Sequence, residues 1–154
     1  MIQLVLARHA KSDWVDESLD DHDRPLNDRG RRDAPAMARS VLRHGVRPEV
    51  LLSSTALRAR TTAEAFGDEF EVEVTERAEL YLAAPDTLLE AARTSGAAEV
   101  MVVAHDPGLS ALVSRLADSD VRMVTAAVAI FTWHEGEWPD VGVVPPDEFE
   151  LLTP

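Results

Sequence analysis

Short apolar runs alternate along this chain with segments in which apolar residues recur every three or four positions. The continuous runs cover residues 2–7, 50–53 and 100–104, and such runs are typical of strands buried on both faces of a parallel sheet. Residues 71–75 alternate polar and apolar, which predicts a further strand with one wet face. The alternation of strands and helical stripes indicates an α/β fold, with a mostly parallel sheet between helices on both faces.

Helical spacing of the apolar residues predicts four helices. The first carries its stripe from Ala34 to Leu42 and is followed by Gly45, a residue that suits a helix end. Asp106 and Pro107 are suited to the cap and the first position of the last helix. The other three helices are expected at residues 56–66 (closed by Gly67), at residues 86–94, and along the stripe Leu109, Leu112, Val113 and Leu116.

The C-terminal part of the chain is expected to give the sheet an antiparallel edge. Residues 123–133 predict a long last strand, and residues 134–136 predict a hairpin turn leading toward residues 138–144. The segment 145–154 contains three prolines and is expected to be irregular, because proline lacks the N–H that a strand ladder needs.

Composition and charge narrow the class of protein. The 154 residues suit a single domain over residues 1–154. The net charge of −13 argues against nucleic acid as a partner. There are no cysteines, and no apolar stretch approaches the ~20 residues of a membrane span. We therefore expect a cytoplasmic protein without a membrane or nucleic-acid partner, whose phosphate pocket, if present, must be a local positive island.

Charged and imidazole side chains stand at the ends of three predicted strands. Arg8 and His9 follow the first strand, Ser53 and Ser54 end the second and precede Arg58, and His105 follows the strand over residues 100–104. Because carboxyl ends of parallel strands share one edge of a sheet, and ligands bind there, we expect these side chains to face one crevice.

This set of residues fits phosphoryl transfer. A neutral imidazole is a nucleophile, and attack by His9 on phosphorus would give a phosphohistidine intermediate. Arg8 and Arg58 can each bind two phosphoryl oxygens, His105 can donate to another, and the helix after Asp106 can direct its N-terminal N–H groups to the same place. Each residue taken alone is more typical of a structural role. His22, His44 and His134 are expected to be solvated, and no ligand spacing accompanies His9 and His105 that would favour a metal site.

Three motifs in order resemble those of the histidine phosphatase superfamily, which includes phosphoglycerate mutases and acid phosphatases. Arg8-His9-Ala10 resembles its Arg-His-Gly signature, and Val103-Ala104-His105 resembles its strand-borne histidine. The second motif, Ser-x-x-Leu-Arg-Ala-x-x-Thr-Ala, is matched by Ser54, Leu57, Arg58, Ala59, Thr62 and Ala63. The resemblance implies a phosphoglycerate mutase-like three-layer α/β/α sandwich that works without cofactor or metal. It makes His9 the phosphorylated nucleophile and places Arg8, Arg58 and His105 around the phosphate.

Further residues resemble the small SixA-type phosphohistidine phosphatases. The segment Asp23-Arg24-Pro25-Leu26 and the residues up to Gly30 match their Arg-Pro-Leu-Thr-x-x-Gly segment, and the short chain speaks against a mutase. By this resemblance Arg24 reaches toward the phosphate, although a turn arginine beside Pro25 is an equal alternative. Ala10 departs from the family glycine, so the backbone there must avoid a positive φ.

The sequence also departs from the family pattern at the position of the general acid. Ester-cleaving relatives place a glutamate after the third strand to protonate the leaving alcohol, which is worth typically ~10²–10⁴-fold. Glu79 is nearby in the sequence, but the Leu80-Tyr81 pattern puts a non-acidic residue at the matching position. Asp13 and Asp16 are other conceivable acids. An imidazole leaving group needs no strong acid, so this departure favours phosphohistidine as substrate.

The sequence therefore predicts a phosphohistidine phosphatase that works on a protein through phospho-His9. One alternative is a phosphatase for small phosphate monoesters with Glu79 as general acid. Another is a non-catalytic module that binds phosphate or phosphoproteins. The partner is a phosphorylated protein or small phosphorylated substrate, whose identity the sequence does not give, and the oligomeric state is open. Trp14, in the acidic segment 11–30, either shapes recognition or packs over the sheet edge.

Overall fold

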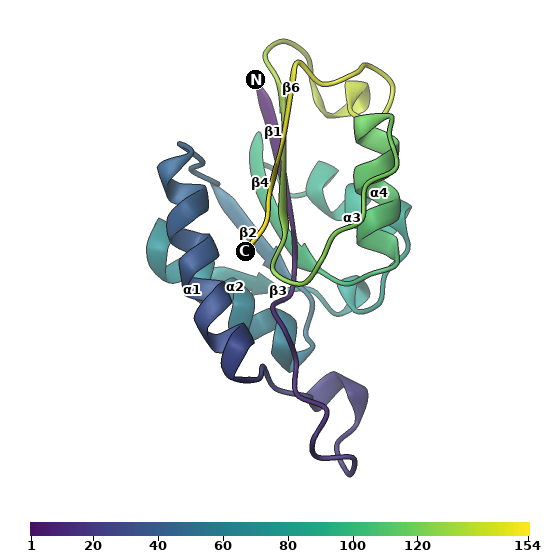
Figure 1. Ribbon diagram of the computed structural model, residues 1–154. Coiled ribbons are helices and arrows are strands. Elements are labelled where there is room, and N and C mark those ends of the chain that lie inside the picture. Colours follow the sequence, from purple (N-terminus) through teal and green to yellow (C-terminus); the bar gives the residue numbers. More distant parts are fainter.

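A six-stranded sheet organises the computed structural model, which describes residues 1–154 (Figure 1). The strand order is β3-β2-β4-β1-β5-β6, in which the four strands β1 to β4 run parallel and β5 and β6 run antiparallel to their neighbours. The strands are β1 (Ile2–Arg8), β2 (Val50–Ser53), β3 (Val74–Glu76), β4 (Glu99–Ala104), β5 (Val128–Trp133) and β6 (Glu148–Leu152). The predicted mostly parallel sheet with an antiparallel edge is confirmed.

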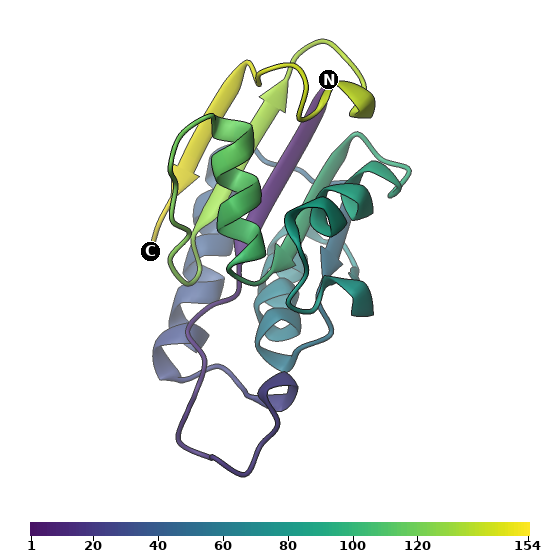
Figure 2. The ribbon, with the colours of Figure 1, turned by 90° about the vertical axis from the view of Figure 1, so that its right-hand side faces the viewer.

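Helices cover both faces of this sheet, as predicted (Figures 1 and 2). The helices α1 and α2 lie over one face and α3 and α4 over the other, which makes a three-layer α/β/α sandwich. They are α1 (Asp28–Arg43), α2 (Leu57–Phe70), α3 (Pro85–Arg93) and α4 (Gly108–Ala117), with short 3₁₀ turns η1 (Asp21–Asp23), η2 (Ala78–Leu80) and η3 (Trp138–Asp140). None of the helices is both long enough and apolar enough to cross a membrane.

The continuous apolar run of β1 is explained by burial on both faces. Leu4 and Leu6 belong to the apolar cluster under α3 and α4, whereas Val5 and Ala7 belong to the cluster under α1 and α2. Successive side chains of a strand point to opposite faces, so a strand with a helix layer on each side needs apolar residues at every position.

Two element boundaries differ from the sequence prediction. Gly67 does not close α2, which continues to Phe70 and ends at Glu71 in the left-handed conformation (φ 58°). A Cβ at Gly67 would lie 2.7 Å from the carbonyl oxygen of Val72, so glycine here allows close approach of the following chain rather than a helix end. The predicted long strand 123–133 is also shorter, because β5 begins only at Val128.

The prediction for the C-terminal segment was wrong. The antiparallel edge is formed by β6 (Glu148–Leu152) and not by residues 138–144, so residues 145–154 are not irregular throughout (Figure 2). Phe149 lies opposite Phe131 of β5, and the two rings stack with centroids 4.7 Å apart. Both prolines near residue 145 precede the strand, where they break no ladder hydrogen bond.

The ends of the parallel strands coincide, and this coincidence creates the site. Arg8 at the end of β1 lies opposite Ala104 at the end of β4, and Ser53 at the end of β2 lies opposite Val103. Because β4 lies between β1 and β2, the residues that follow all three strands emerge side by side.

Candidate active site

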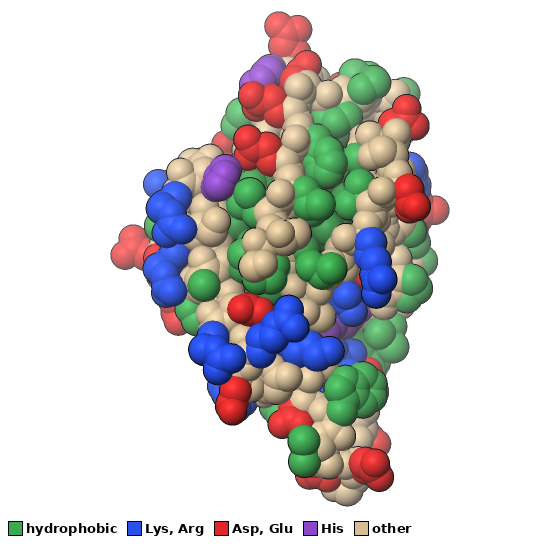
Figure 3. Space-filling model, in the orientation of Figure 1, with side chains coloured by type: hydrophobic (Ala, Val, Ile, Leu, Met, Phe, Trp, Pro, Cys, Tyr) green, Lys and Arg blue, Asp and Glu red, His purple; other side chains and the backbone are tan.

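A cavity of about 260 Å³ lies at this edge of the sheet. All five residues that the sequence singled out contribute to its wall, which is formed by Arg8, His9, Lys11, Ser12, Trp14, Arg24, Arg58, Leu82, His105, Asp106 and Thr125. Figure 3 shows Lys and Arg side chains gathered beside histidine in the lower part of one face, on a protein whose net charge is −13. The structure therefore contains the local positive island that a phosphate pocket requires.

His9 presents one unprotonated ring nitrogen to the cavity. Its Nδ1 lies 2.8 Å from the carbonyl oxygen of Ala10, and because a carbonyl only accepts, Nδ1 carries the hydrogen and the lone pair is on Nε2. Burial, together with the charges of Arg58 and Arg8, lowers the pKa of His9 to about 4, although the hydrogen bond to Ala10 opposes the shift. Ala10 has no positive φ, so alanine fits this position without strain, as predicted. His9 is thus a neutral, oriented imidazole at neutral pH.

His105 lies against His9, with ring centroids 5.2 Å apart. Its Nε2 is 2.7 Å from Oγ of Ser54, which also accepts the N–H of Ala56 at 3.2 Å. The Ser54 hydroxyl can donate its hydrogen to Nε2, and in that tautomer the ring hydrogen of His105 lies on Nδ1. Burial, followed by the nearby His9 and Arg58, lowers the pKa of His105 to about 3. His105 is therefore a neutral imidazole, not an imidazolium.

Several donors in the cavity wall have no partner within the protein. Nδ1 of His105 and the Nε atoms of Arg8 and Arg58 are buried and make no hydrogen bond. Buried polar groups are nearly always paired, and three of the four unpaired buried side-chain atoms belong to residues of this wall. This concentration of cations and unpaired groups indicates a site for an anion with several acceptor oxygens. The Nη1 of Arg8 is held at 2.9 Å by the carbonyl of Met123, which fixes the direction of its guanidinium.

Arg24 reaches into the same cavity rather than staying in a surface turn. Its side chain is buried, with Nη1 2.7 Å from Oγ of Ser12 and the guanidinium 3.5 Å from the ring centroid of Trp14. Trp14 does not pack over the sheet edge. It is 66% exposed and forms part of the cavity rim.

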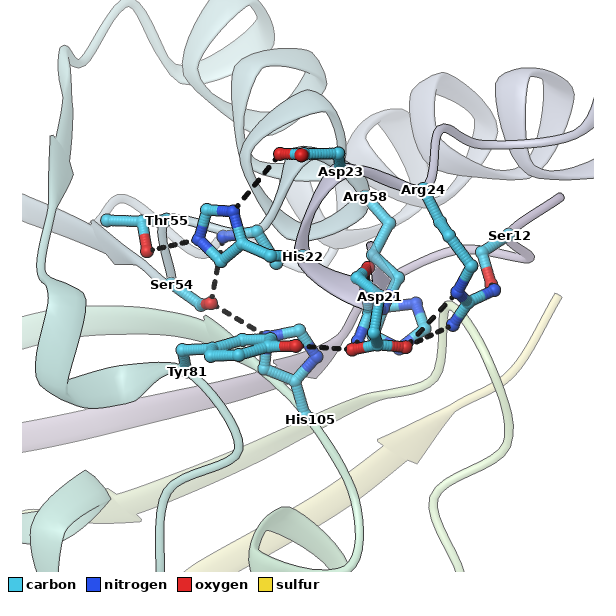
Figure 4. Close-up of polar contacts among 12 residues, drawn as sticks. Ser12, Asp21, His22, Asp23, Arg24, Ser54, Thr55, Arg58, Tyr81 and His105 are labelled. Atoms are coloured by element: carbon cyan, nitrogen blue, oxygen red, sulfur yellow. Dashed lines mark hydrogen bonds and ion pairs between the residues drawn. The ribbon is translucent and has the colours of Figure 1, made fainter. Parts of the chain in front are cut away.

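Sequence reasoning missed a polar cluster at the cavity mouth, formed by Asp21, Tyr81 and His22 (Figure 4). The Asp21 carboxylate accepts hydrogen bonds from Arg58 at 2.9 Å, from Arg24 at 3.1 Å and from Tyr81 at 2.5 Å. His22, expected to be solvated, contacts Oγ1 of Thr55 at 2.8 Å and the ring of Tyr81 at 4.9 Å. Nothing in the sequence distinguished Asp21 from its acidic neighbours. Its position three residues before Arg24 is the one signal that could have marked it.

The carboxylates considered as general acids lie elsewhere. Glu79 is outside the cavity wall and pairs with Arg77. Backbone hydrogen bonding and Arg77 lower the pKa of Glu79, which weakens it as an acid. Asp13 and Asp16 accept hydrogen bonds from their own turns. Asp106 is the one carboxylate in the wall, but both its oxygens are 2.8 Å from donors of Ser110. The predicted cap was wrong by one residue, since Pro107 and not Asp106 occupies the N-cap position of α4. Helix α4 begins one residue later than predicted, at Gly108, and its first turn is occupied by this carboxylate.

Comparison with known proteins identifies the family. The family model of the histidine phosphatase superfamily (branch 1) matches residues 4–81. The chain belongs to the histidine phosphatase superfamily. An uncharacterised protein of Mycobacterium tuberculosis is 41% identical over 148 residues, covering 87% of this chain and 90% of the relative.

Solved structures place the chain in the SixA-type branch of this superfamily. A crystal structure from Agrobacterium tumefaciens, provisionally named phosphohistidine phosphatase SixA, matches with a TM-score of 0.84 and 26% identity, covering 99% of this chain and 98% of that one. A protein of the same provisional name from Nakamurella multipartitia matches with a TM-score of 0.82 and 31% identity, covering 99% of this chain and 96% of that one. The chain is thus a phosphatase with the phosphoglycerate mutase-like fold that the motifs implied.

Because both histidines have lowered pKa values in the folded protein, we expect folding stability to decrease as the pH is lowered from 7 to 5. In the unfolded chain a histidine binds a proton near its ordinary pKa of ~6.5, whereas folded His9 and His105 bind one only near pH 4 and 3. Between pH 6.5 and 5 the unfolded state therefore binds more protons, and each histidine removes about 1–2 kcal/mol of stability at pH 5. Urea unfolding at pH 7 and pH 5 measures this loss.

A matched variant separates this effect from other titrations. The variant His9→Asn reduces the dependence of the free energy of unfolding on pH, because asparagine does not titrate. A free energy of unfolding that is equal at pH 7 and pH 5 would contradict the burial of two neutral imidazoles.

Proposed function

We propose that this protein is a phosphohistidine phosphatase, which dephosphorylates phosphohistidine on a protein through a phospho-His9 intermediate. The observation that carries the proposal is the set of orphaned donors on Arg8, Arg58 and His105 around a histidine whose Nε2 is free. Binding an anion needs cations and donors but no oriented nucleophile. A purely binding module therefore leaves the arrangement of His9 without a purpose.

The first step transfers the phosphoryl group to the protein. The Nε2 lone pair of His9 attacks phosphorus while the bond from phosphorus to the substrate's imidazole nitrogen breaks and its electron pair returns to that ring. Arg8, Arg58 and Arg24 neutralise the phosphoryl oxygens, and Nδ1–H of His105 donates to one of them. Charge neutralisation and positioning are the main requirements of phosphoryl transfer, and rigidly held arginines supply both.

Water completes the cycle by attacking phosphorus in phospho-His9. The bond to Nε2 breaks, its electron pair returns to the ring, and the proton lost by water leaves with phosphate or to solvent. The hydrogen bond from Nδ1 to the carbonyl of Ala10 keeps the ring in the same orientation through both steps. No group in the cavity wall has to supply a strong acid in either step.

The carboxylates near the cavity favour an imidazole leaving group, because none of them is placed to act as a general acid. An alkoxide leaves poorly without a positioned acid, and Glu79 is held by Arg77 outside the cavity while Asp106 is engaged by Ser110. An imidazole protonated on its other nitrogen leaves as a neutral ring. The two SixA-type neighbours, both given phosphohistidine phosphatase names, agree with this choice of substrate.

A substrate panel tests the proposal. We expect kcat/KM for a phosphohistidine peptide to exceed that for an alkyl phosphate by ~10²-fold or more, because the alkyl ester lacks acid assistance. The activated ester p-nitrophenyl phosphate should fall between them. Glu79→Gln should leave all three values within about twofold. Efficient alkyl phosphate hydrolysis that collapses in Glu79→Gln would instead establish an ester phosphatase.

A further inference from the structure

The Asp21 carboxylate lies at the mouth of the cavity rather than in its wall, in an adjoining pocket that shares Trp14 and Arg24 with the cavity. His9, Arg58 and His105 are 7%, 3% and 1% exposed and form the floor, whereas the side chain of Asp21 is 43% exposed. Asp21 comes from η1, in the long loop between β1 and α1, and contacts the outer, terminal nitrogens of Arg58 and Arg24. In Figure 4 it lies between Tyr81 and Arg24.

In-line attack directs the leaving group toward this mouth. The nucleophile on the cavity floor and the departing atom lie on opposite sides of phosphorus. A phosphoryl group held by Arg8, Arg58 and His105 above His9 therefore turns its leaving group outward, to the side of the cavity that is open to solvent, where the half-exposed Asp21 contacts Arg58 and Arg24. The same direction is required if the substrate is a side chain of a large protein that stays outside the cavity.

Asp21 is an ionised carboxylate that can accept a hydrogen bond from the substrate. Burial opposes ionisation, but hydrogen bonds from Tyr81 and Arg58 and the charge of Arg58 hold the pKa of this carboxyl well below its usual value. Its two oxygens accept from Arg58, Arg24 and Tyr81. A phosphoryl group offers these arginines three strong acceptor oxygens, and each guanidinium that turns to phosphate frees an acceptor site on Asp21.

We propose that Asp21 is a specificity-determining residue that accepts an N–H from the phosphorylated imidazole of the substrate. This inference rests on the proposed function. The carboxylate stabilises the ring in its protonated form, the form that leaves as neutral imidazole when the bond from nitrogen to phosphorus breaks. Asp21 stays ionised throughout and transfers no proton. Alkyl and aryl esters offer it no N–H, and esters that carry a carboxylate are repelled.

Tyr81 supports this role. Its hydroxyl donates to Asp21, and its ring stands edge-on to His105 at 5.4 Å and to His22 at 4.9 Å. The hydroxyl therefore holds the carboxylate in place. Tyr81 is a positioning residue for Asp21, since its contact with the reaction runs through that carboxylate.

The variant Asp21→Asn tests the proposal, because asparagine keeps the shape and removes the charge. We expect the ratio of kcat/KM for a phosphohistidine peptide to that for p-nitrophenyl phosphate to fall at least tenfold. Inhibition by inorganic phosphate should become severalfold stronger, since the arginines lose their internal anion. Tyr81→Phe should lower the same ratio by a smaller factor. The matched control is Asp20→Asn, which removes the same charge from the adjacent exposed residue, whose side chain makes no hydrogen bond within the protein.

Two outcomes would overturn the role of Asp21. Equal losses on both substrates together with weaker phosphate inhibition would show that Asp21 only orders the arginines. An unchanged ratio of the two kcat/KM values in Asp21→Asn would show that the leaving imidazole does not contact Asp21. The proposed function fails differently, through a wild-type protein that does not turn over the phosphohistidine peptide at all.

Discussion

Replacing His9 with alanine is expected to lower phosphohistidine turnover by ~10³-fold or more, because the variant has no atom that can accept the phosphoryl group. The remaining donors of Arg8, Arg58 and His105 still bind phosphate, so inhibition constants for phosphate should change far less than kcat. Initial rates on a phosphohistidine peptide, together with phosphate inhibition measured against residual activity or by calorimetry, give both quantities.

The phosphorylated intermediate supplies a direct readout of the same residue. Rapid acid-free quenching of the wild-type protein with substrate should trap phosphate on His9, identified by mass spectrometry of peptides kept at alkaline pH. His44→Ala is the matched control, since His44 is an exposed histidine on the flank of α1. Phosphate trapped on another residue, or undiminished turnover by His9→Ala, would contradict the mechanism.

Loss of the Arg58 guanidinium is the second large effect that we expect. Arg58→Ala should lower kcat/KM by ~10²–10³-fold, the range seen when one preorganised donor to a developing charge is removed. Arg58→Lys should recover only part of this loss, because an ammonium group keeps the charge but not the planar pair of donors. Arg58 is 3% exposed and its Nε is unpaired, so solvent cannot replace its guanidinium as a donor.

Arg60 provides the comparison for this variant. It lies on the same helix, but its side chain is 41% exposed and forms only long ion pairs with Glu64 at 3.8 Å and Glu76 at 3.9 Å. Arg60→Ala should therefore keep kcat/KM within about twofold. Steady-state kinetics on one substrate preparation compare the three variants, and circular dichroism confirms that each is folded. Equal effects at positions 58 and 60 would show a general response to lost charge instead of a phosphate contact.

Local sequence patterns failed where a long-range partner decided the structure. Residues 148–152 form β6 because β5 offers them a free edge and Phe131 a stacking partner for Phe149, and neither is visible in the segment itself. Gly67 resembles a helix stop, yet the carbonyl of Val72 is what excludes a side chain there.

The sequence by itself determined the layered α/β fold and which residues meet at the candidate site. Buried parallel strands need continuous apolar runs, and their carboxyl ends share one edge, so Arg8, His9, Arg58 and His105 could be brought together on paper. Only the tertiary structure decided what surrounds them. The contacts of the ionised Asp21 with Arg58 and the Tyr81 hydroxyl depend on how the acidic loop folds beside the cavity, and the pairing of Glu79 with Arg77 depends on the η2 turn. Asp21 differs from the other carboxylates of that loop only in its contacts with arginines. Those contacts cannot be predicted from the local sequence.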